Sequence, residues 1–189
     1  LVEHKVPGIY NIDTRALTKR IRDKGAMLAR ITFDLDMMET GTLASAVGFD
    51  NPNERNLIAE VSRKDVRIYG EGNPVKILAV DCGIKNNMLR HLCKRGCEVK
   101  VVPWNHDITK EPYDGLFLSN GPGNPEMAAE TTEFVRQIIS GESGVNPEHP
   151  IFGICMGNQL LGTAAGAQTY KMPFGNRGQN VPVLNVITG

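Results

Sequence analysis

Cys155 is the residue whose surroundings most clearly predict chemistry. It stands in the run Gly-Ile-Cys-Met-Gly (153–157), between a short apolar stretch and a sequence with helical periodicity. A strand-to-helix turn with glycines two residues either side is the layout of a nucleophile elbow, here with a thiol in place of the usual hydroxyl. At a helix N-terminus the helix dipole and the free amides favour the thiolate, which is the attacking form. The alternative interpretation is a buried cysteine between two loop glycines.

A glycine-rich loop upstream predicts a partner for this thiol. The apolar run 115–119 leads into Asn-Gly-Pro-Gly-Asn-Pro (120–125), and a helical pattern starts near Glu126. The backbone N–H groups of such a loop can stabilise a developing oxyanion. Taken alone, the loop favours an ordinary strand-to-helix turn. Together with Cys155 it favours acyl transfer through a thioester.

Both motifs resemble the signatures of a known family. Residues 118–125 and 153–159 look like the two signature motifs of class I (triad-type) glutamine amidotransferases. Further segments resemble the glutaminase part of carbamoyl-phosphate synthetases, and these are 6–18, 80–87, 169–172 and 175–180. The amino-acid sequences of 56–62, 102–107 and 176–180 look most like those of the mitochondrial, urea-cycle branch of animals. The resemblance covers nearly the whole chain.

The resemblance implies a role for five residues. Cys155 matches the nucleophile that attacks the side-chain amide of glutamine. Gly121 and Met156 match the positions whose backbone N–H groups form the oxyanion hole, and Gly123 and Gln159 match positions that help bind glutamine.

The resemblance also implies a partner and a location. The ammonia would pass to a carbamoyl-phosphate synthetase domain or subunit, fused or separate, that uses ATP, magnesium and bicarbonate. No cofactor is implied for this segment itself. The expected location is the mitochondrial matrix, with the cytoplasm as the alternative.

One position departs from the family pattern and keeps a second function open. The family usually has histidine where this chain has Asn158. That residue is not the general base, but its replacement bears on efficient use of glutamine. The alternatives are therefore an active glutaminase and a glutaminase-inactive structural or regulatory domain of an ammonia-dependent synthetase. A third reading is a cysteine hydrolase of similar fold that acts on another amide or thioester.

A thiol nucleophile of this kind needs a general base, usually a histidine oriented by a carboxylate. The four histidines of the chain, at positions 4, 91, 106 and 149, are poorly placed for this role in the predicted order of elements. The family carries its base and acidic partner well downstream of the cysteine. We therefore expect the chain to stop before them, and the segment to be inactive by itself.

Composition excludes several classes of function. The 189 residues carry 21 basic and 21 acidic side chains, so no broad basic surface predicts binding to nucleic acid or to an anionic membrane. The apolar runs are far shorter than a membrane span. Leu1 follows neither a signal peptide nor a transit peptide, so the segment looks cut from a longer chain. Four cysteines do not form a disulfide framework, and Cys93 and Cys97 lack the further ligands of a metal site.

The elements around the two motifs alternate between strand and helix. Strands are predicted at 75–80, 98–102, 115–119 and 151–154, and helices near 84–92, 126–140 and 156–165. This order predicts an α/β fold with a mostly parallel sheet and helices on both faces. Active sites of such sheets form outside the carboxyl ends of the strands, where both motifs fall. Further strands are predicted at 168–171 and 183–187. The resemblance implies a flavodoxin-like fold of the class I amidotransferase type.

The N-terminal third differs from this pattern. Asp13 is expected to cap a helix over 14–24 that Gly25 ends, followed by a strand at 27–33 and a loop with a weak helix over 34–55. Residues 66–74 look like a linker. The resemblance implies that 1–67 is the C-terminal part of a small α+β domain, which docks onto the synthetase. Residues 74–189 would then be an amidotransferase domain truncated before its base.

Overall fold

A computed structural model of the chain describes residues 1–31, 49–175, 182 and 184–189. It separates into two compact units, one of Asn51–Thr169 and one of Leu1–Asp50 with Tyr170–Gly189. Of the loop with a weak helix that is predicted over 34–55, residues 34–48 lie outside the described residues, and so does the predicted motif 176–180.

A five-stranded sheet forms the centre of the Asn51–Thr169 unit, with strand order β1-β3-β2-β4-β5. The strands are β1 (Arg67–Tyr69), β2 (Val75–Asp81), β3 (Cys97–Pro103), β4 (Gly115–Leu118) and β5 (Ile151–Gly153). Strands β2 to β5 are parallel, and β1 alone pairs antiparallel, with β3. The prediction of a mostly parallel sheet is confirmed.

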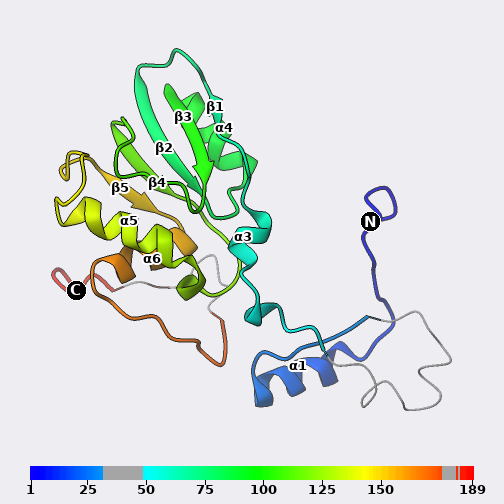
Figure 1. Ribbon diagram of the computed structural model, residues 1–189. Coiled ribbons are helices and arrows are strands. Elements are labelled where there is room, and N and C mark those ends of the chain that lie inside the picture. The colour runs from blue at the N-terminus through cyan, green and yellow to red at the C-terminus, as the bar shows by residue number, and fades with distance from the viewer. Residues whose placement is uncertain (32–48, 176–181, 183) are drawn as a thin grey trace. The chain divides into compact units, whose positions relative to one another are not determined.

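Helices cover both faces of this sheet, as predicted (Figure 1). The helices are η2 (Pro52–Glu54), α3 (Leu57–Val61), α4 (Asn86–Lys94), η3 (Pro125–Ala128), α5 (Ala129–Ile139) and α6 (Met156–Ala164). Helices α5 and α6 pack on the face that carries Leu78 and Leu118, while α4 packs on the opposite face over Ala79 and Phe117. Successive strand residues point to opposite faces, so strands buried on both sides read as continuous apolar runs.

Four sequence predictions, one of a linker and three of strands, are wrong within the described residues. The predicted linker contains β1, whose Arg67 and Tyr69 pair with Val101 and Val99. Conversely, residues 168–171, 184–187 and 27–31 form no strand. A strand exists only where its backbone finds a partner edge, and that partner is a distant segment that a local apolar pattern does not specify.

The Leu1–Asp50 unit contains α1 (Thr14–Lys24), whose predicted ends are confirmed. The Asp13 Oδ1 accepts a hydrogen bond from the Ala16 amide at 2.8 Å, and Gly25 ends the helix with φ +79°. No residue of α1 is buried, so the bounds of this helix are defined by its capping residues Asp13 and Gly25 rather than by packing in a core. A left-handed φ at the residue after a helix favours glycine, which is why this stop could be predicted.

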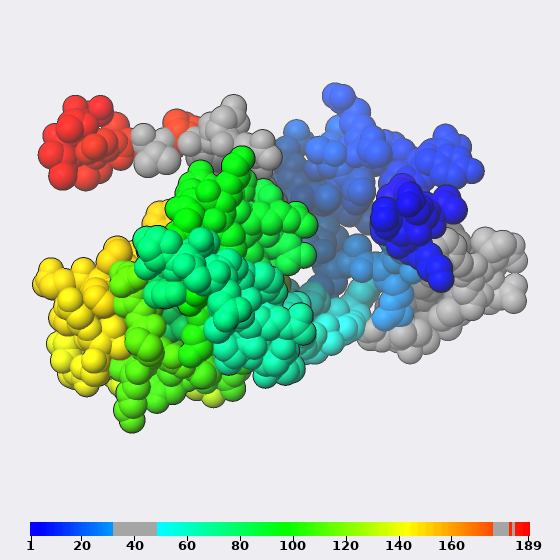
Figure 2. Space-filling model, turned by 90° about the horizontal axis from the view of Figure 1, so that it is seen from above, coloured from blue at the N-terminus to red at the C-terminus, as the bar shows by residue number. Residues whose placement is uncertain are grey.

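The segment that precedes β2 belongs to the Asn51–Thr169 unit and packs against its sheet. Ile58 of α3 is 0% exposed and belongs to the core between the sheet and α5. In Figure 2 the cyan-to-teal stretch that holds α3 and β1 lies directly on the green part of this unit. Figure 1 shows α3 just beyond the arrowheads of β2 and β3, at the end of the sheet where the strands finish.

The contact between α6 and β4 gives a test of the fold. A Cβ at Gly157 would lie 2.1 Å from the carbonyl oxygen of Leu118, whereas one at Gly162 of the same helix would meet only the Ala167 Cβ, at 3.9 Å. Gly157→Ala should therefore lower the free energy of unfolding by about 3 kcal/mol, because helix and strand must move apart. Gly162→Ala should raise it by about 0.5–1 kcal/mol through helix propensity.

Urea denaturation of the two variants and the wild type measures both effects. Equal changes in stability would contradict the described packing, since both glycines lie in one helix and differ only in what surrounds them.

Candidate functional site

Cys155 has a backbone conformation that non-glycine residues rarely adopt. It lies between the end of β5 and the start of α6, at the N-cap position, with φ +54° and ψ −107°. Such a conformation costs about 1–3 kcal/mol and persists only where the surroundings enforce it. The predicted strand–turn–helix geometry is present at this cysteine.

Two close backbone contacts enforce the turn. The Ile154 amide donates to the Leu118 carbonyl and the Gly157 amide donates to the Ser119 carbonyl, both at 3.0 Å. A Cβ at Gly153 would lie 2.5 Å from the Gly157 carbonyl group. The chain therefore reverses within a space that admits only glycine at positions 153 and 157.

The thiol of Cys155 is exposed, unlike the other cysteine at this end of the sheet. Cys82 is 0% exposed, and burial together with the charge of Asp81 raises the pKa of its thiol to about 12. A buried thiol of this kind stays protonated and inert. Accessibility thus separates the two cysteines as candidate nucleophiles.

Met156 and Gln159 follow Cys155 on α6. Met156 is the first residue of the helix, where the backbone N–H has no partner within the helix, and its side chain is 2% exposed. The Gln159 amide donates to the Cys155 carbonyl at 3.1 Å, one turn along the helix. Gln159 is exposed in the first turn of α6, next to the turn that holds Cys155.

Gly121 and Gly123 lie in the loop that follows β4. A Cβ at Gly121 would lie 2.2 Å from the Cys82 carbonyl oxygen, so only glycine fits there, and Gly123 has φ +85°. The Ser119 hydroxyl accepts a hydrogen bond from the Cys82 amide at 2.9 Å and fixes the loop to the end of β2.

The structure brings all five predicted residues to one end of the sheet. The Gly157–Ser119 hydrogen bond places the Cys155 turn beside the loop of Gly121 and Gly123. The loops after β2 and β4 leave toward opposite faces, since α4 follows one and α5 the other. Such a switch point at the carboxyl ends of parallel strands is where ligands bind in open α/β sheets.

The histidines of the Asn51–Thr169 unit lie away from this turn. His106 follows β3 and pairs with Glu111 at 2.7 Å, and β2 and β4 lie between β3 and β5. Three strand spacings separate His106 from the elbow by roughly 14 Å. His149 precedes β5 at its amino end, and His91 lies on α4. Within the described residues no hydrogen bond joins a histidine to Cys155.

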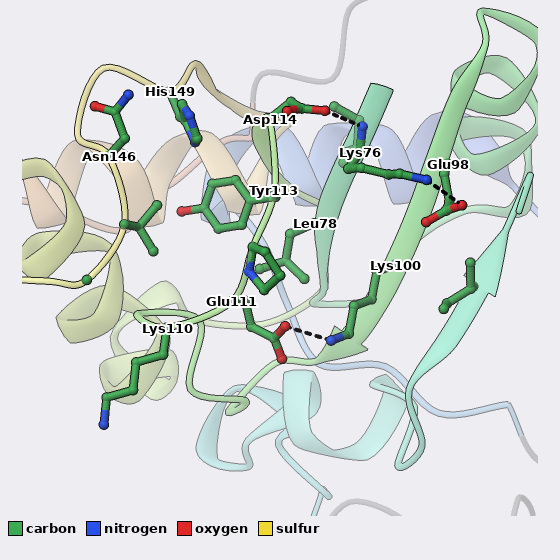
Figure 3. Close-up of a pocket in the computed structure, with 15 residues that line it drawn as sticks. Lys76, Leu78, Glu98, Lys100, Lys110, Glu111, Tyr113, Asp114, Asn146 and His149 are labelled. Atoms are coloured by element: carbon green, nitrogen blue, oxygen red, sulfur yellow. Dashed lines mark hydrogen bonds and ion pairs between the residues drawn. The ribbon is translucent and has the colours of Figure 1, made fainter. Parts of the chain in front are cut away.

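A separate cavity of about 620 Å³, lined by both charged and apolar side chains, lies at the amino ends of the strands (Figure 3). Lys76 pairs with Glu98 at 2.8 Å and Lys100 with Glu111 at 2.6 Å. Burial tends to raise the pKa of Glu111, but hydrogen bonds from Lys100 and His106 outweigh it and lower that pKa.

None of the five predicted residues lines this cavity. Its Tyr113 hydroxyl and His149 Nδ1 have no hydrogen-bond partner in the described part of the chain, but both atoms are enclosed by protein rather than open to the cavity. Burial raises the pKa of Tyr113 to about 12. Most of the charged side chains that line the cavity are thus already paired with one another.

Neither a metal centre nor a spanning helix is found in the parts of the chain that are described. No three His, Cys, Asp or Glu side chains gather within 1–31 and 49–175 in a way that could hold a metal ion. No described helix has the length and apolar character needed to cross a bilayer.

A buried ion pair at the same end of the sheet was not among the residues predicted from the sequence. Asp81, at the end of β2, is 4% exposed and accepts a hydrogen bond from the Arg63 Nε at 3.1 Å. The available signal was an acidic residue that directly follows an apolar strand. Its cationic partner lies 18 residues earlier, in a segment without periodicity, and could not be identified from the pattern.

Comparison with known proteins adds two family matches and several relatives. Residues 78–188 match the model of glutamine amidotransferase class-I, and residues 1–31 match the carbamoyl-phosphate synthase small chain, CPSase domain. Carbamoyl-phosphate synthase [ammonia], mitochondrial, from Homo sapiens is 55% identical over 98% of this chain and 12% of its own length. The protein of that name from Aquarana catesbeiana is 50% identical over 100% of this chain and 12% of its own.

A second group of relatives carries another name. The multifunctional protein CAD of Squalus acanthias is 47% identical over 98% of this chain and 8% of its own length. The chain thus spans about an eighth or less of the curated relatives it matches. Because the amidotransferase match extends over more than half of the chain and includes both the Cys155 turn and the glycine-rich loop, the chain belongs to the class-I glutamine amidotransferase family.

Proposed function

We propose that this chain is the glutamine-hydrolysing part of a carbamoyl-phosphate synthase, with Cys155 as the nucleophile. The observation that carries the proposal is the exposed thiol at φ +54° on the N-terminus of α6, inside the region that matches the amidotransferases. Helix-terminal amides and dipole favour a thiolate at this position.

The geometry supports the following reaction. The Cys155 thiolate attacks the amide carbon of glutamine, and the resulting oxyanion accepts hydrogen bonds from the amides of Gly121 and Met156. The carbon–nitrogen bond then breaks, and ammonia leaves with a proton supplied by a general acid. Water attacks the thioester, releases glutamate and restores the thiol. Gly123 and Gln159 are proposed to hold the glutamine.

The partner is proposed to be a synthetase that consumes the ammonia together with ATP and bicarbonate. The match of residues 1–31 to the small-chain domain and the full-length relatives support this pairing. We retain 1–67 as the part that docks onto the synthetase and 74–189 as the amidotransferase part. The names of the Homo sapiens and Aquarana catesbeiana relatives favour a mitochondrial location.

A second candidate function is a glutaminase-inactive domain that supports an ammonia-dependent synthetase. Asn158, exposed on α6 where the family usually has histidine, favours it, and so does the word ammonia in the relatives' names. The retained Cys155 and Gln159 favour hydrolysis. The two functions differ in whether glutamine supplies the nitrogen, which experiment can decide.

Cys155 should be the thiol that a glutamine-like chloroketone modifies first in the full-length protein. It is exposed and begins a helix, whereas the Cys82 thiol is buried with a pKa raised to about 12. Peptide mass spectrometry identifies the modified cysteine. Cys97→Ala serves as the control and should leave the labelling unchanged. Modification of Cys82 with Cys155 unreacted would rule out the elbow assignment.

Cys155→Ser in the full-length protein should reduce glutamine-dependent carbamoyl phosphate synthesis by at least about 10³-fold, because a hydroxyl replaces the attacking thiolate. Synthesis from free ammonia should be unchanged, since it does not use the thioester. Both rates are measured side by side. A wild-type protein that already makes no carbamoyl phosphate from glutamine would favour the ammonia-dependent alternative.

The purified 189-residue chain should release no ammonia from glutamine. No described histidine contacts the Cys155 turn, and general acid–base assistance contributes about 10²–10⁴-fold. Ammonia release by this chain is compared with release by the full-length protein. Robust and equal turnover would show that one of the four histidines acts as the base after all.

A further inference from the structure

We propose that residues 56–63 act as a brace that positions the loop of Gly121 and Gly123. The brace consists of α3 with its flanking residues Asn56 and Arg63, and Asp81 is its anchor on β2. The positioning itself depends only on the contacts described next. The benefit to oxyanion stabilisation rests on the proposed function. The brace precedes the residues 78–188 that match the amidotransferase model.

The first contact joins the start of α3 to the segment just after the loop. Asn56 Nδ2 donates a hydrogen bond to the Met127 carbonyl at 2.9 Å, across 71 residues of sequence. Its Oδ1 accepts from the Ala59 amide at 3.0 Å and caps α3. One side chain therefore both starts the helix and ties it to η3, into which the loop runs.

The second contact is the packing of α3 against two glycines. A Cβ at Gly123 would lie 3.3 Å from the Leu57 Cβ, and one at Gly83 would lie 3.2 Å from both the Val61 Cγ2 and the Pro122 Cδ. Ile58, which lies between Leu57 and Val61 in the sequence, is fully buried and fixes the helix in the core. The face of α3 thus supports the loops after β2 and β4 together.

The third contact is the charge pair at the end of the brace. The Asp81 Oδ2 accepts from the amide and the Nε of Arg63, each at 3.1 Å. The Asp81 Oδ1 accepts from the amides of Gly83 and Ile84 at 2.9 and 2.8 Å. A Cβ at Gly83 would lie 3.3 Å from the Gly121 Cα, so the carboxylate links the brace to the candidate oxyanion loop through one intervening residue.

Glycines make such a support necessary. A loop with two glycines and free amides has many accessible conformations, and ordering it by itself is costly. Amide donors act on an oxyanion only when they are already aimed at it. A brace that Ile58 anchors in the core supplies this preorganisation from outside the loop.

The variant Asn56→Asp in the full-length protein distinguishes the two roles of Asn56, the bond to Met127 and the cap of α3. The carboxylate of the variant keeps the oxygen that caps α3 but loses the N–H donor to Met127. Its second oxygen then faces the Met127 carbonyl oxygen, and the two repel each other. Asn51→Asp is the matched control, because the bonds of the Asn51 side chain within the described residues go to Asn53 and Glu54, at η2 itself. Asn56→Ser, which keeps a capping oxygen without adding charge, repeats the test if the aspartate variant does not fold.

Amide hydrogen exchange over residues 119–127 is the first measurement. It should become about three- to tenfold faster in Asn56→Asp, the effect of losing one net hydrogen bond, and stay unchanged in Asn51→Asp. Unchanged exchange in both Asn56 variants would overturn the brace.

Alkylation of Cys155 by two reagents is the second measurement. A glutamine-like chloroketone passes through an oxyanion, whereas iodoacetamide reacts at a saturated carbon and does not. Asn56→Asp should slow the chloroketone about tenfold and leave iodoacetamide unchanged. Equal slowing of both reagents would mean that the thiol itself is disturbed, and would overturn the positioning role. If neither reagent modifies wild-type Cys155, the proposed function fails, while the exchange rates still decide the brace.

Discussion

The close approach of α6 to β4 is the constraint on which the candidate site depends. Gly157 has no side chain, so its backbone comes within hydrogen-bond distance of Ser119, and Gly153 passes directly beneath it. The connection between β5 and α6 is then too short for an ordinary turn, and Cys155 takes a positive φ. The strained backbone of Cys155 is thus maintained by the apolar packing of α6 against the sheet.

A second set of contacts joins loops that the chain separates widely. The hydroxyl of Ser119 fixes the end of β4 to Cys82, and the carboxylate of Asp81 holds both Gly83 and Arg63. These groups accept hydrogen bonds from backbone amides that are buried or partly buried where the parallel strands end. Polar side chains at this end of the sheet therefore hold the loops in place, and the exposed thiol beside them remains free to react.

The family match and the structure support different parts of the functional conclusion. The match establishes a class-I glutamine amidotransferase domain, while the relatives include enzymes named for ammonia as well as the multifunctional CAD protein. The geometry at Cys155 is that of an accessible nucleophile, whereas Asn158 lies exposed on the same helix. Whether the domain hydrolyses glutamine or only supports the synthetase therefore depends on a few side chains around the Cys155 turn, which is itself intact.

The sequence by itself determined the features that arise from local or periodic rules. Strand–helix alternation predicted β2 to β5 and α4 to α6, Asp13 and Gly25 predicted the ends of α1, and the glycine spacing predicted the turn at Cys155. Tertiary structure alone decided the pairing of β1 with β3, the absence of strands at 168–171 and 184–187, and the hydrogen bond of Asn56 to Met127. These depend on partners tens of residues away, and a contact at that distance leaves no periodic trace in either segment.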